Sequence, residues 1–468
     1  MSAPAKRPTA AEIDKTYVWH PFTQMREWTD EGTDVVVIVE GKGAVLRDDR
    51  GREYLDGNAS IWTNLHGHRH PIIDDAVRHQ LERIAHCSFL GTTNEVAPEL
   101  ARELVVLMNH PEKNYRVFFS DDGSTAMEAG LKMIVQGRLQ RGESGRNRFV
   151  SIAAGYHGDT VGAMSLGHSE LFHRPFRSLL FPSREVPSPA CYRCPHNRAH
   201  PKRGSDARLT RECAWECIDK LRETFDEEPD TVAAFTLEPL VQGAAGMAMH
   251  PRGYLQKAAA LCAERGIWLM LDEVMTGFGR TGAMFAFEKE DVIPDVLALG
   301  KGISGGYVPL AATIAAGTIY EAFLGEYAEF KTFFHGHSYS GNPLGCAAAR
   351  ASLKVFKQDS VLETNRAKAE RLGQAAAVFW SHPNVGDVRQ EGMICAIELV
   401  ADFESRAPFS AEDRVGFRVT EAAKKHGLLT RPIGNVLVLM PPYCVTPSQI
   451  DQMTDALWRA LNEVLPLK

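Results

Sequence analysis

The run Trp268-Leu-Met-Leu-Asp-Glu-Val274, followed by Leu297-Ala-Leu-Gly-Lys-Gly302, decides the fold of this chain. The first run is apolar and ends in two carboxylates, a pattern typical of a buried strand in a parallel sheet. The second run places a single lysine between glycines, on an expected tight turn. This spacing suits a chemistry in which Asp272 and Lys301 both reach one bound aromatic ring.

The chemistry that needs this pair is that of pyridoxal phosphate. A lysine amine forms a Schiff base with the cofactor aldehyde, and a carboxylate facing the ring nitrogen keeps that nitrogen protonated. The protonated ring can then accept the electrons of a deprotonated substrate carbon. We therefore interpret Lys301 as the anchor and Asp272 as the partner of the ring nitrogen. Taken alone, Asp272 could also be a capping acid and Lys301 a solvated surface lysine.

A second pattern in the same stretch points elsewhere. Gly277-Phe-Gly-Arg-Thr-Gly282 follows a strand and matches the dinucleotide fingerprint. The carboxylates of Asp272 and Glu273 stand where a pyrophosphate would approach, the segment after Gly282 has no clear helical period, and no strand-borne acid follows at the usual spacing. The sequence therefore disfavours a nicotinamide cofactor.

Length and composition indicate a small-molecule enzyme. The chain has 468 residues, 44% of them hydrophobic, and a net charge of −7, so it can bury a large core in two or three domains and has no basic footprint for nucleic acid. The first residues carry no apolar signal core and no run approaches a membrane span, which favours the cytoplasm. Nine cysteines, an odd number, predict free thiols rather than a disulfide scaffold.

Candidate site residues lie where strands are expected to end. The run 115–119 is an expected strand that leads into Gly123, Ser124 and Thr125, a turn and helix start whose N–H groups suit a phosphate. A plain helix N-cap by Ser124 is the alternative. Tyr156, after the next strand, can stack on the pyridine ring, and Asp159 is an acid on the same turn. Strands alternating with helices predict an open α/β sheet with its ligand at the strand C-termini.

Three further patterns bear on the fold and the site. Residues 35–55 read as a small antiparallel sheet with a hairpin tip at 49–51. His66, His68 and His70 invite a metal hypothesis, but they lie in a glycine-broken loop with no acid beside them, which favours polar packing. Arg431 is a candidate fork for a carboxylate or else a surface arginine.

An insert rich in cysteine stands apart from these motifs. Thiolate pairs at such spacings can bind zinc, so a structural zinc site is a hypothesis, while no metal is expected in the active site. The cysteines concerned are Cys191, Cys194, Cys213 and Cys217.

Together the motifs resemble the class III, fold-type I aminotransferases, and within them the adenosylmethionine-8-amino-7-oxononanoate aminotransferases of biotin synthesis. The matching segments are Trp19-His-Pro-Phe22, Ser120-Asp-Asp-Gly-Ser124, Tyr156-His-Gly-Asp159, Glu238-Pro-Leu-Val-Gln-Gly-Ala244, Asp272-Glu-Val-Met-Thr-Gly-Phe-Gly-Arg-Thr-Gly282, Leu299-Gly-Lys-Gly302, His335-Gly-His-Ser338 and Thr430-Arg-Pro432. The resemblance implies an α/β fold with a large, mainly parallel-sheet domain and a smaller α+β domain built from both chain ends. The expected divisions are a flexible arm 1–16, a small domain 17–70 and 346–468, and a large pyridoxal phosphate-binding domain 71–345.

The resemblance also implies roles for individual residues. Lys301 would carry the Schiff base and shuttle the proton, with Asp272 and Tyr156 as the other catalytic residues. Tyr156 and Val274 would sandwich the ring, Gly123 and Ser124 would bind the phosphate, and Ser338 would reach the phosphate of a neighbouring subunit in a homodimer. The residues expected to contact the amino donor and keto acceptor are Phe22, Ile61, Trp62, Tyr156, Asp159, Arg280, Gly336 and Arg431.

The resemblance leaves the amino donor open. Where adenosylmethionine-using members commonly show a tyrosine and a tryptophan pair, this chain has Phe22 and Ile61-Trp62, and here it is similar to the branch that uses lysine. The expected reaction converts 8-amino-7-oxononanoate to 7,8-diaminononanoate, with S-adenosylmethionine or lysine as donor. A broader ω-amine:pyruvate transaminase is the alternative, with taurine, β-alanine or another ω-amino donor. A catalytically inactive pyridoxal phosphate-binding regulator is a third class, disfavoured because Lys301 and Asp272 are intact.

Overall fold

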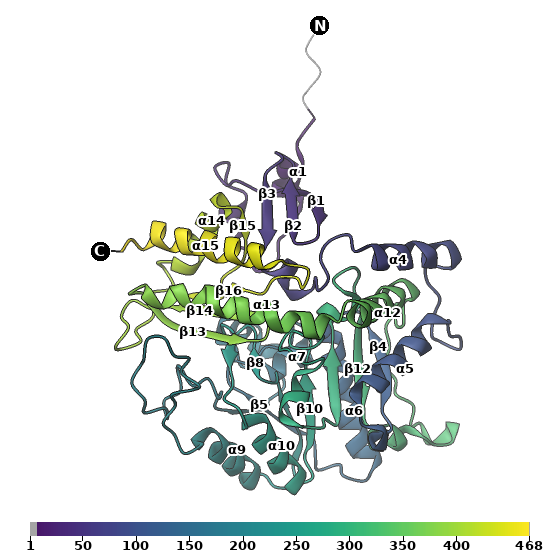
Figure 1. Cartoon of the computed structure of the whole chain (residues 1–468). Coiled ribbons are helices and arrows are strands. Elements are labelled where there is room, and N and C mark those ends of the chain that lie inside the picture. The colour runs from purple at the N-terminus through teal and green to yellow at the C-terminus, as the bar shows by residue number, and fades with distance from the viewer. Residues whose placement is uncertain (1–6, 468) are drawn as a thin grey trace.

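A twisted seven-stranded sheet forms the centre of the molecule (Figure 1). The computed structural model describes residues 7–467. The strands, in spatial order, are β4 (Arg116–Ser120), β12 (Ala311–Ala315), β11 (Val296–Leu299), β10 (Trp268–Asp272), β7 (Val232–Leu237), β5 (Arg148–Ile152) and β6 (Arg184–Val186). β12 pairs antiparallel with both of its neighbours, and the pairs on the other side of β11 are parallel. The prediction of a mainly parallel sheet is confirmed.

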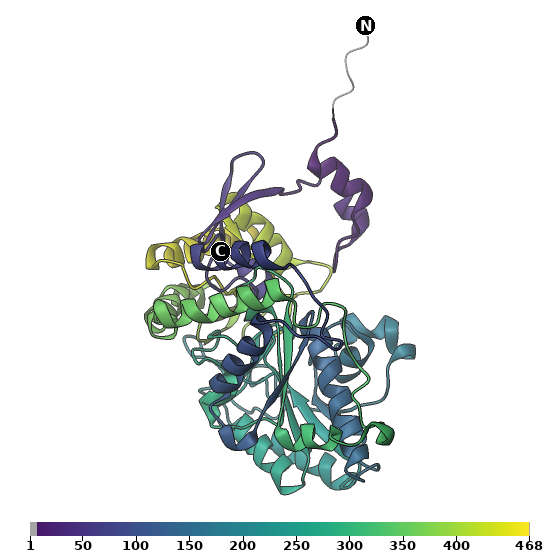
Figure 2. The same ribbon diagram turned by 90° about the vertical axis from the view of Figure 1, so that its right-hand side faces the viewer.

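Helices cover both faces of this sheet (Figure 2). α6 (Gly123–Gln140) and α7 (Val161–Leu166) share one core cluster with Met270 of β10, whereas α5 (Val96–Met108), α9 (Glu216–Glu227) and α10 (Tyr254–Glu264) share the other with Leu269 and Leu271. Because successive strand residues point to opposite faces, a strand buried on both sides must be apolar throughout. This explains the uninterrupted apolar run that begins at Trp268.

Two smaller sheets accompany the central one, and both ends of the chain meet in the first of them. The first has the order β1 (Ile38–Lys42), β2 (Val45–Asp48), β3 (Glu53–Asp56) and β15 (Leu428–Leu429), and the second β13 (Val385–Glu391), β14 (Ile394–Leu399) and β16 (Val436–Leu439). β2 and β3 form the antiparallel hairpin expected from residues 35–55, and β15 adds in parallel to β3. In Figure 1 these sheets lie above the central sheet, with the C-terminal helices around them.

The remaining elements complete the layers. The α-helices are α1 (Ala10–Tyr17), α2 (Met25–Trp28), α3 (Ala59–Trp62), α4 (Pro71–Arg83), α8 (Glu170–His173), α11 (Gly317–Tyr320), α12 (Pro343–Gln358), α13 (Val361–Ala376), α14 (Val415–Lys425) and α15 (Pro447–Val464). The 3-10 turns are η1 (Pro111–Lys113), η2 (Arg174–Leu179), η3 (Ala286–Glu290), η4 (Lys301–Ser304), η5 (Glu321–Phe323), η6 (Tyr327–Glu329) and η7 (Ala377–Ser381), and a short ladder joins β8 (Val241–Gln242) to β9 (Ala248–Met249). Within residues 7–467 no helix is long and apolar enough to cross a membrane.

The segment expected to be a flexible arm is partly helical. Residues 10–17 form α1, which begins with a capping box between Thr9 and Glu12. Asp14 of this helix accepts a hydrogen bond from the indole N–H of Trp28 at 2.8 Å, so α1 packs back on the segment that follows it. Residues 1–6 of the expected arm lie outside the described residues. The expected domain divisions remain predictions.

Candidate active site

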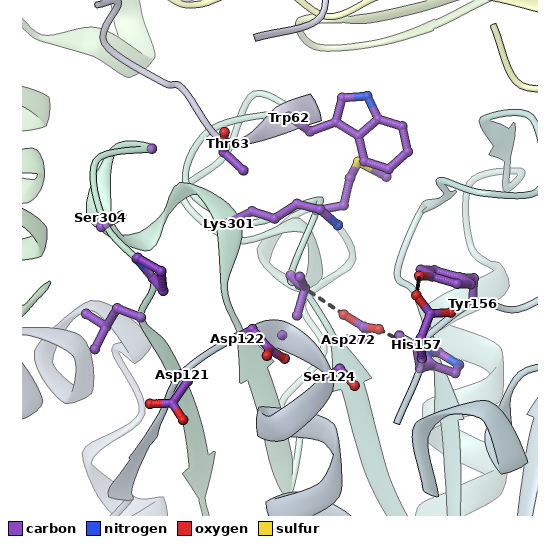
Figure 3. Close-up of a pocket in the computed structure, with 18 of the residues that line it drawn as sticks. Trp62, Thr63, Asp121, Asp122, Ser124, Tyr156, His157, Asp272, Lys301 and Ser304 are labelled. Atoms are coloured by element: carbon purple, nitrogen blue, oxygen red, sulfur yellow. Dashed lines mark hydrogen bonds and ion pairs between the residues drawn. The ribbon is translucent and has the colours of Figure 1, made fainter. Parts of the chain in front are cut away.

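A cavity of about 700 Å³ opens at the carboxyl ends of the central strands (Figure 3). Asp121 follows β4, Tyr156 follows β5, Glu238 follows β7 and Lys301 follows β11, while Asp272 ends β10. Parallel strands end at the same edge of a sheet, and side chains beyond those ends share one crevice. The strand order therefore gathers residues that are up to 180 positions apart in the sequence.

Lys301 lies on a strained turn between Gly300 and Gly302. Its backbone has a φ of 40°, in the left-handed region that residues with side chains rarely adopt. Its ammonium lies 5.1 Å from the centre of the Trp62 indole ring. Desolvation lowers the pKa of Lys301, and the charges of Asp272 and Glu238 oppose that change. The amine is thus closer to its neutral form than a surface lysine.

Asp272 is held in one orientation by two hydrogen bonds. Its Oδ1 accepts from the backbone N–H of Val274 at 3.0 Å, and its Oδ2 lies 2.7 Å from Nδ1 of the buried His157. Burial lowers the pKa of His157, but its hydrogen bond to Asp272 and the charge of Asp272 outweigh this and raise it. Asp272 thus has at its back a histidine whose charged form it favours, and it lines the cavity as well.

Glu238 is a second buried carboxyl in the same wall. Its two oxygens accept from the backbone N–H groups of Tyr156 at 3.2 Å and Gly243 at 2.7 Å. Burial raises its pKa to about 7, although the neighbouring His157 lowers it. Sequence analysis gave no role to Glu238 or His157. The available signal was their place inside matched segments, His157 directly after Tyr156 and Glu238 at a strand end.

The N-terminus of α6 forms one side of the cavity. Asp122 caps the helix, accepting from the N–H of Thr125 at 2.9 Å, and the Ser124 hydroxyl donates to Thr160 at 2.7 Å. A Cβ on Gly123 would stand only 2.5 Å from Cγ1 of Val274, so only glycine fits there. The first N–H groups of a helix lack intrahelical acceptors and attract anions. Gly123 and Ser124 line the cavity, whereas Thr125 is engaged in the cap.

Aromatic side chains form the outer wall. The Tyr156 hydroxyl donates to Asp159 at 2.8 Å, and burial, followed by this contact, raises the pKa of Tyr156. Phe172 packs edge-on against Tyr156 and against Phe22, with ring centres 5.9 and 5.5 Å apart. Sequence analysis did not single out Phe172, because a phenylalanine in a four-residue helix carries no signal of its neighbours.

The predicted site residues fall into two groups. Trp62, Gly123, Ser124, Tyr156, Asp159, Asp272, Val274 and Lys301 line the cavity. Phe22, Ile61, Gly336, Ser338 and Arg431 lie outside it and are exposed, and Arg431 donates to the backbone oxygen of Phe22 at 3.3 Å.

Arg280 belongs to neither group. It is completely buried, donates to the backbone oxygens of Pro441 at 2.7 Å and Asn64 at 3.2 Å, and lies over the Tyr443 ring. Arg280 thus joins the backbones of Asn64 and Pro441, and its expected role among the substrate residues remains a prediction.

The histidines and cysteines that suggested metal sites make other contacts in the structure. His66 lies 2.9 Å from the Ser352 hydroxyl, and His68 lies 3.0 Å from Asp56. The cysteines of the insert are unpaired thiols, and burial raises the pKa of Cys191 and of Cys217 to about 12. Over residues 7–467 no group of three or more His, Cys, Asp or Glu side chains is arranged to hold a metal ion. The zinc hypothesis gains no support from this arrangement.

Comparison with known proteins identifies the family. The aminotransferase class-III family model matches residues 28–461. A relative from Geobacter sulfurreducens called adenosylmethionine-8-amino-7-oxononanoate aminotransferase is 46% identical over 97% of this chain and 98% of its own length. A similarly named relative from Methanocaldococcus jannaschii is 41% identical over 96% of this chain and 97% of its own.

Solved structures agree. The crystal structure of the aminotransferase of that name from Methanocaldococcus jannaschii has a TM-score of 0.88 at 39% identity, covering 97% of this chain and 98% of that one. An amine transaminase from an uncultivated Pseudomonas species, in its PLP-bound form, has a TM-score of 0.86 at 32% identity, covering 96% and 98%. The chain therefore belongs to the class III aminotransferases, a family of pyridoxal phosphate-dependent transferases.

Proposed function

We propose that this chain transfers an amino group to 8-amino-7-oxononanoate, giving 7,8-diaminononanoate for biotin biosynthesis, with S-adenosylmethionine or lysine as donor. The observation that carries the chemistry is the single cavity that Lys301 and the oriented Asp272 share. The acceptor is supported by the name of relatives that are 41% and 46% identical over nearly the whole chain.

The residues fit pyridoxal phosphate. The α6 N-terminus with Gly123 and Ser124 offers N–H groups for a phosphate, and the lack of a side chain on Gly123 keeps that side of the cavity clear. Tyr156 and Val274 would cover the two faces of the ring. When bound, the cofactor supplies an electron sink for the charge left on a deprotonated substrate carbon.

The protein's own part is to hold and move protons. The carboxylate of Asp272 would face the ring nitrogen and hold a proton there, and His157 orients that carboxylate through its 2.7 Å contact. The amine of Lys301 would take the proton from the substrate carbon that carries the amino group and pass it to C4′ of the cofactor, and in the second half-reaction it would move a proton the other way. A neutral amine is needed for this, and burial favours it by lowering the pKa of Lys301.

Substrate binding involves the rest of the wall. Trp62, Ile61, Phe22 and Tyr156 offer apolar surface for a long carbon chain, and Asp159 offers a carboxylate to a substrate ammonium group. Arg431 is exposed and donates to the backbone oxygen of Phe22, and its guanidinium would bind a substrate carboxylate in two parallel hydrogen bonds.

A homodimer with shared active sites belongs to the same proposal, in the cytoplasm. Gly336 and Ser338 lie on an exposed loop outside this chain's own cavity, and the neighbouring Phe334 is 74% exposed. A large exposed phenylalanine beside a glycine and a serine suits a surface that a second copy covers. Ser338 would then reach the phosphate in the partner's site.

The test is a single-turnover absorbance experiment on the cofactor-loaded protein. The protein is mixed separately with 7,8-diaminononanoate, S-adenosylmethionine, lysine and β-alanine, and loss of the band of the lysine-bound cofactor is followed. Diaminononanoate, and either S-adenosylmethionine or lysine, are expected to convert this band. Conversion by β-alanine but not diaminononanoate would favour the ω-amine:pyruvate alternative, to which the similarity of solved omega transaminases also points. A protein without such a band would overturn the proposal.

Lys301→Ala provides the matching control. Without the amine, no group remains at that place to bind the cofactor covalently or to move the Cα proton, so turnover is expected to vanish while bound cofactor is retained without its lysine-linked band. Full turnover by this variant, measured with the same substrates, would contradict the role of Lys301.

A further inference from the structure

Four consecutive residues form a left-handed turn beside the active site. Ala59, Ser60, Ile61 and Trp62 have φ values of 45°, 49°, 64° and 68°. Residues with side chains rarely adopt this conformation, and a β-branched isoleucine adopts it least readily. A run of four, with no glycine among them, persists only where surrounding contacts hold it in place.

The contacts that hold the turn converge on Asp56. This residue ends β3 and is 3% exposed. Its Oδ1 accepts from the backbone N–H of Ser60 at 3.0 Å, and its Oδ2 accepts from the Ser60 hydroxyl at 3.0 Å. Asp56 therefore binds the second residue of the turn through both carboxylate oxygens.

His68 supports Asp56 from the other side. Its Nε2 lies 3.0 Å from Asp56 Oδ2, and its backbone is fixed by two hydrogen bonds with Gly43, at 2.8 and 3.0 Å. This contact gives a function to one of the three histidines that drew attention in the sequence. The histidine restrains the carboxylate that restrains the turn.

The turn delivers Trp62 to the active site. The Trp62 indole N–H donates to Asn58 at 2.8 Å, and its ring centre lies 5.1 Å from the Lys301 ammonium. On its far edge, a Cβ on Gly243 would stand 3.2 Å from the indole, so this ring packs directly on the loop that bears Glu238 at its start. A change in the turn would move the indole relative to Lys301.

We propose that Asp56, supported by His68, is a positioning residue that holds Trp62 over Lys301 by fixing the left-handed turn. Asp56 does not line the cavity, so it acts on substrate fit and on the lysine through the turn that carries Trp62. The inference rests on the proposed function to the extent that Trp62 and Lys301 form the active site.

The test compares two buried aspartates of one sheet. Asp48, 1% exposed, ends β2 and accepts the N–H groups of Arg50 at 3.0 Å and Arg52 at 2.8 Å, on the hairpin tip. Asp56→Ala is expected to raise the KM for the amino donor about tenfold and to lower kcat, the order expected when hydrogen bonds to a charged group are lost. Asp48→Ala, measured at a temperature where both variants are folded, is expected to leave both constants within about twofold.

Fluorescence reports the position of Trp62 independently of turnover. A tryptophan close to the bound cofactor transfers its excitation energy to it, so its fluorescence is quenched. The chain has seven tryptophans, and the loss of quenching in Trp62→Phe measures how much of the total comes from Trp62. Asp56→Ala is expected to lose the Trp62 contribution to the quenching, and Asp48→Ala is expected to keep it. Asp56→Asn retains one acceptor and should fall between.

A rescue variant separates positioning from a general loss of stability. Glycine adopts positive φ without strain, so Ala59→Gly in the Asp56→Ala background should restore part of the KM and of the quenching. Identical kinetics and quenching in Asp56→Ala and Asp48→Ala would overturn the inference. If none of the amines reacts with the wild-type protein, the proposed function is overturned. The fluorescence quenching of the variants would still show whether Asp56 holds Trp62 in place.

Discussion

At the scale of single residues, the reactive end of the site depends on His157, a buried histidine in the cavity wall. His157 fixes Asp272 at 2.7 Å, and replacing it by leucine leaves the carboxylate without that donor. His157→Leu is expected to lower kcat/KM about 10- to 100-fold and to weaken cofactor binding, since hydrogen bonds between charged groups are the strong ones. Steady-state kinetics and cofactor titration measure both.

A second buried histidine serves as the control. His382 is fully buried, and its Nε2 lies 2.9 Å from the backbone oxygen of Leu465, in the C-terminal sheet layer. His382→Leu should reduce stability but leave cofactor affinity unchanged. Equal losses of affinity in the two variants would show that His157 acts through stability alone.

Glu238 predicts a pH dependence of stability at the same scale. Burial raises its pKa from 4.5 to about 7, so the folded protein keeps a proton that the unfolded chain releases. This contribution to the free energy of unfolding is fully present below about pH 4.5 and is lost as the pH rises to about 7. At about 1.4 kcal/mol per pH unit, the total loss is about 3 kcal/mol. Glu238→Gln cannot ionise, so its free energy of unfolding in urea should lack this decline. Parallel curves for wild type and variant between pH 5 and 8 would contradict the assignment.

At the scale of elements, the start of α6 depends on a glycine. Gly123→Ala would bring a Cβ to 2.5 Å from Val274, forcing the helix end and the wall apart. Cofactor affinity, measured by titration of the apoprotein, is expected to fall about tenfold or more, because the N–H groups that face the phosphate shift. Gly145→Ala is the control, since its Cβ would meet only the oxygen of Asp230 at an ordinary 3.7 Å. Unchanged affinity in Gly123→Ala would exclude a tight phosphate cup there.

Elements with a strong local pattern were predictable from the sequence. The strand expected at 115–119 appears as β4, and the apolar run at Trp268 is β10. The turn 59–62 was not predictable, because its left-handed backbone depends on Asp56 and His68, which are held by β3 and a loop. Likewise, no local signal tells that His157 meets Asp272, 115 positions away. Periodicity reports which face is buried, whereas such contacts depend on the order of strands in the sheet.

At the scale of the whole molecule, the cysteine insert connects the large sheet with the C-terminal sheet. Arg208 pairs with Glu391 at 3.0 Å, Arg193 with Glu398 at 2.8 Å, and Arg203 donates to the backbone oxygen of His382 at 3.0 Å. The same network extends to the turn between β8 and β9, because Arg389 of β13 pairs with Glu398 and donates to the backbone oxygen of Met247 at 2.7 Å. The sequence showed the insert's cysteines but not its arginine contacts, whose partners lie about 200 residues later.

Assembly is the last property at this scale. If the exposed loop around Phe334 is covered by a second copy, a charge there should break the interface, because an aspartate cannot be buried without a partner. Phe334→Asp is expected to sediment as a monomer in analytical ultracentrifugation and to lose activity together with the dimer, as each proposed site takes Ser338 from its partner. Leu209→Asp changes a residue that is 81% exposed on the cysteine insert, and it should sediment as the wild type does. If Phe334→Asp is monomeric and active, each chain completes its own site. If Phe334→Asp is still a dimer, the interface lies on another face of the molecule.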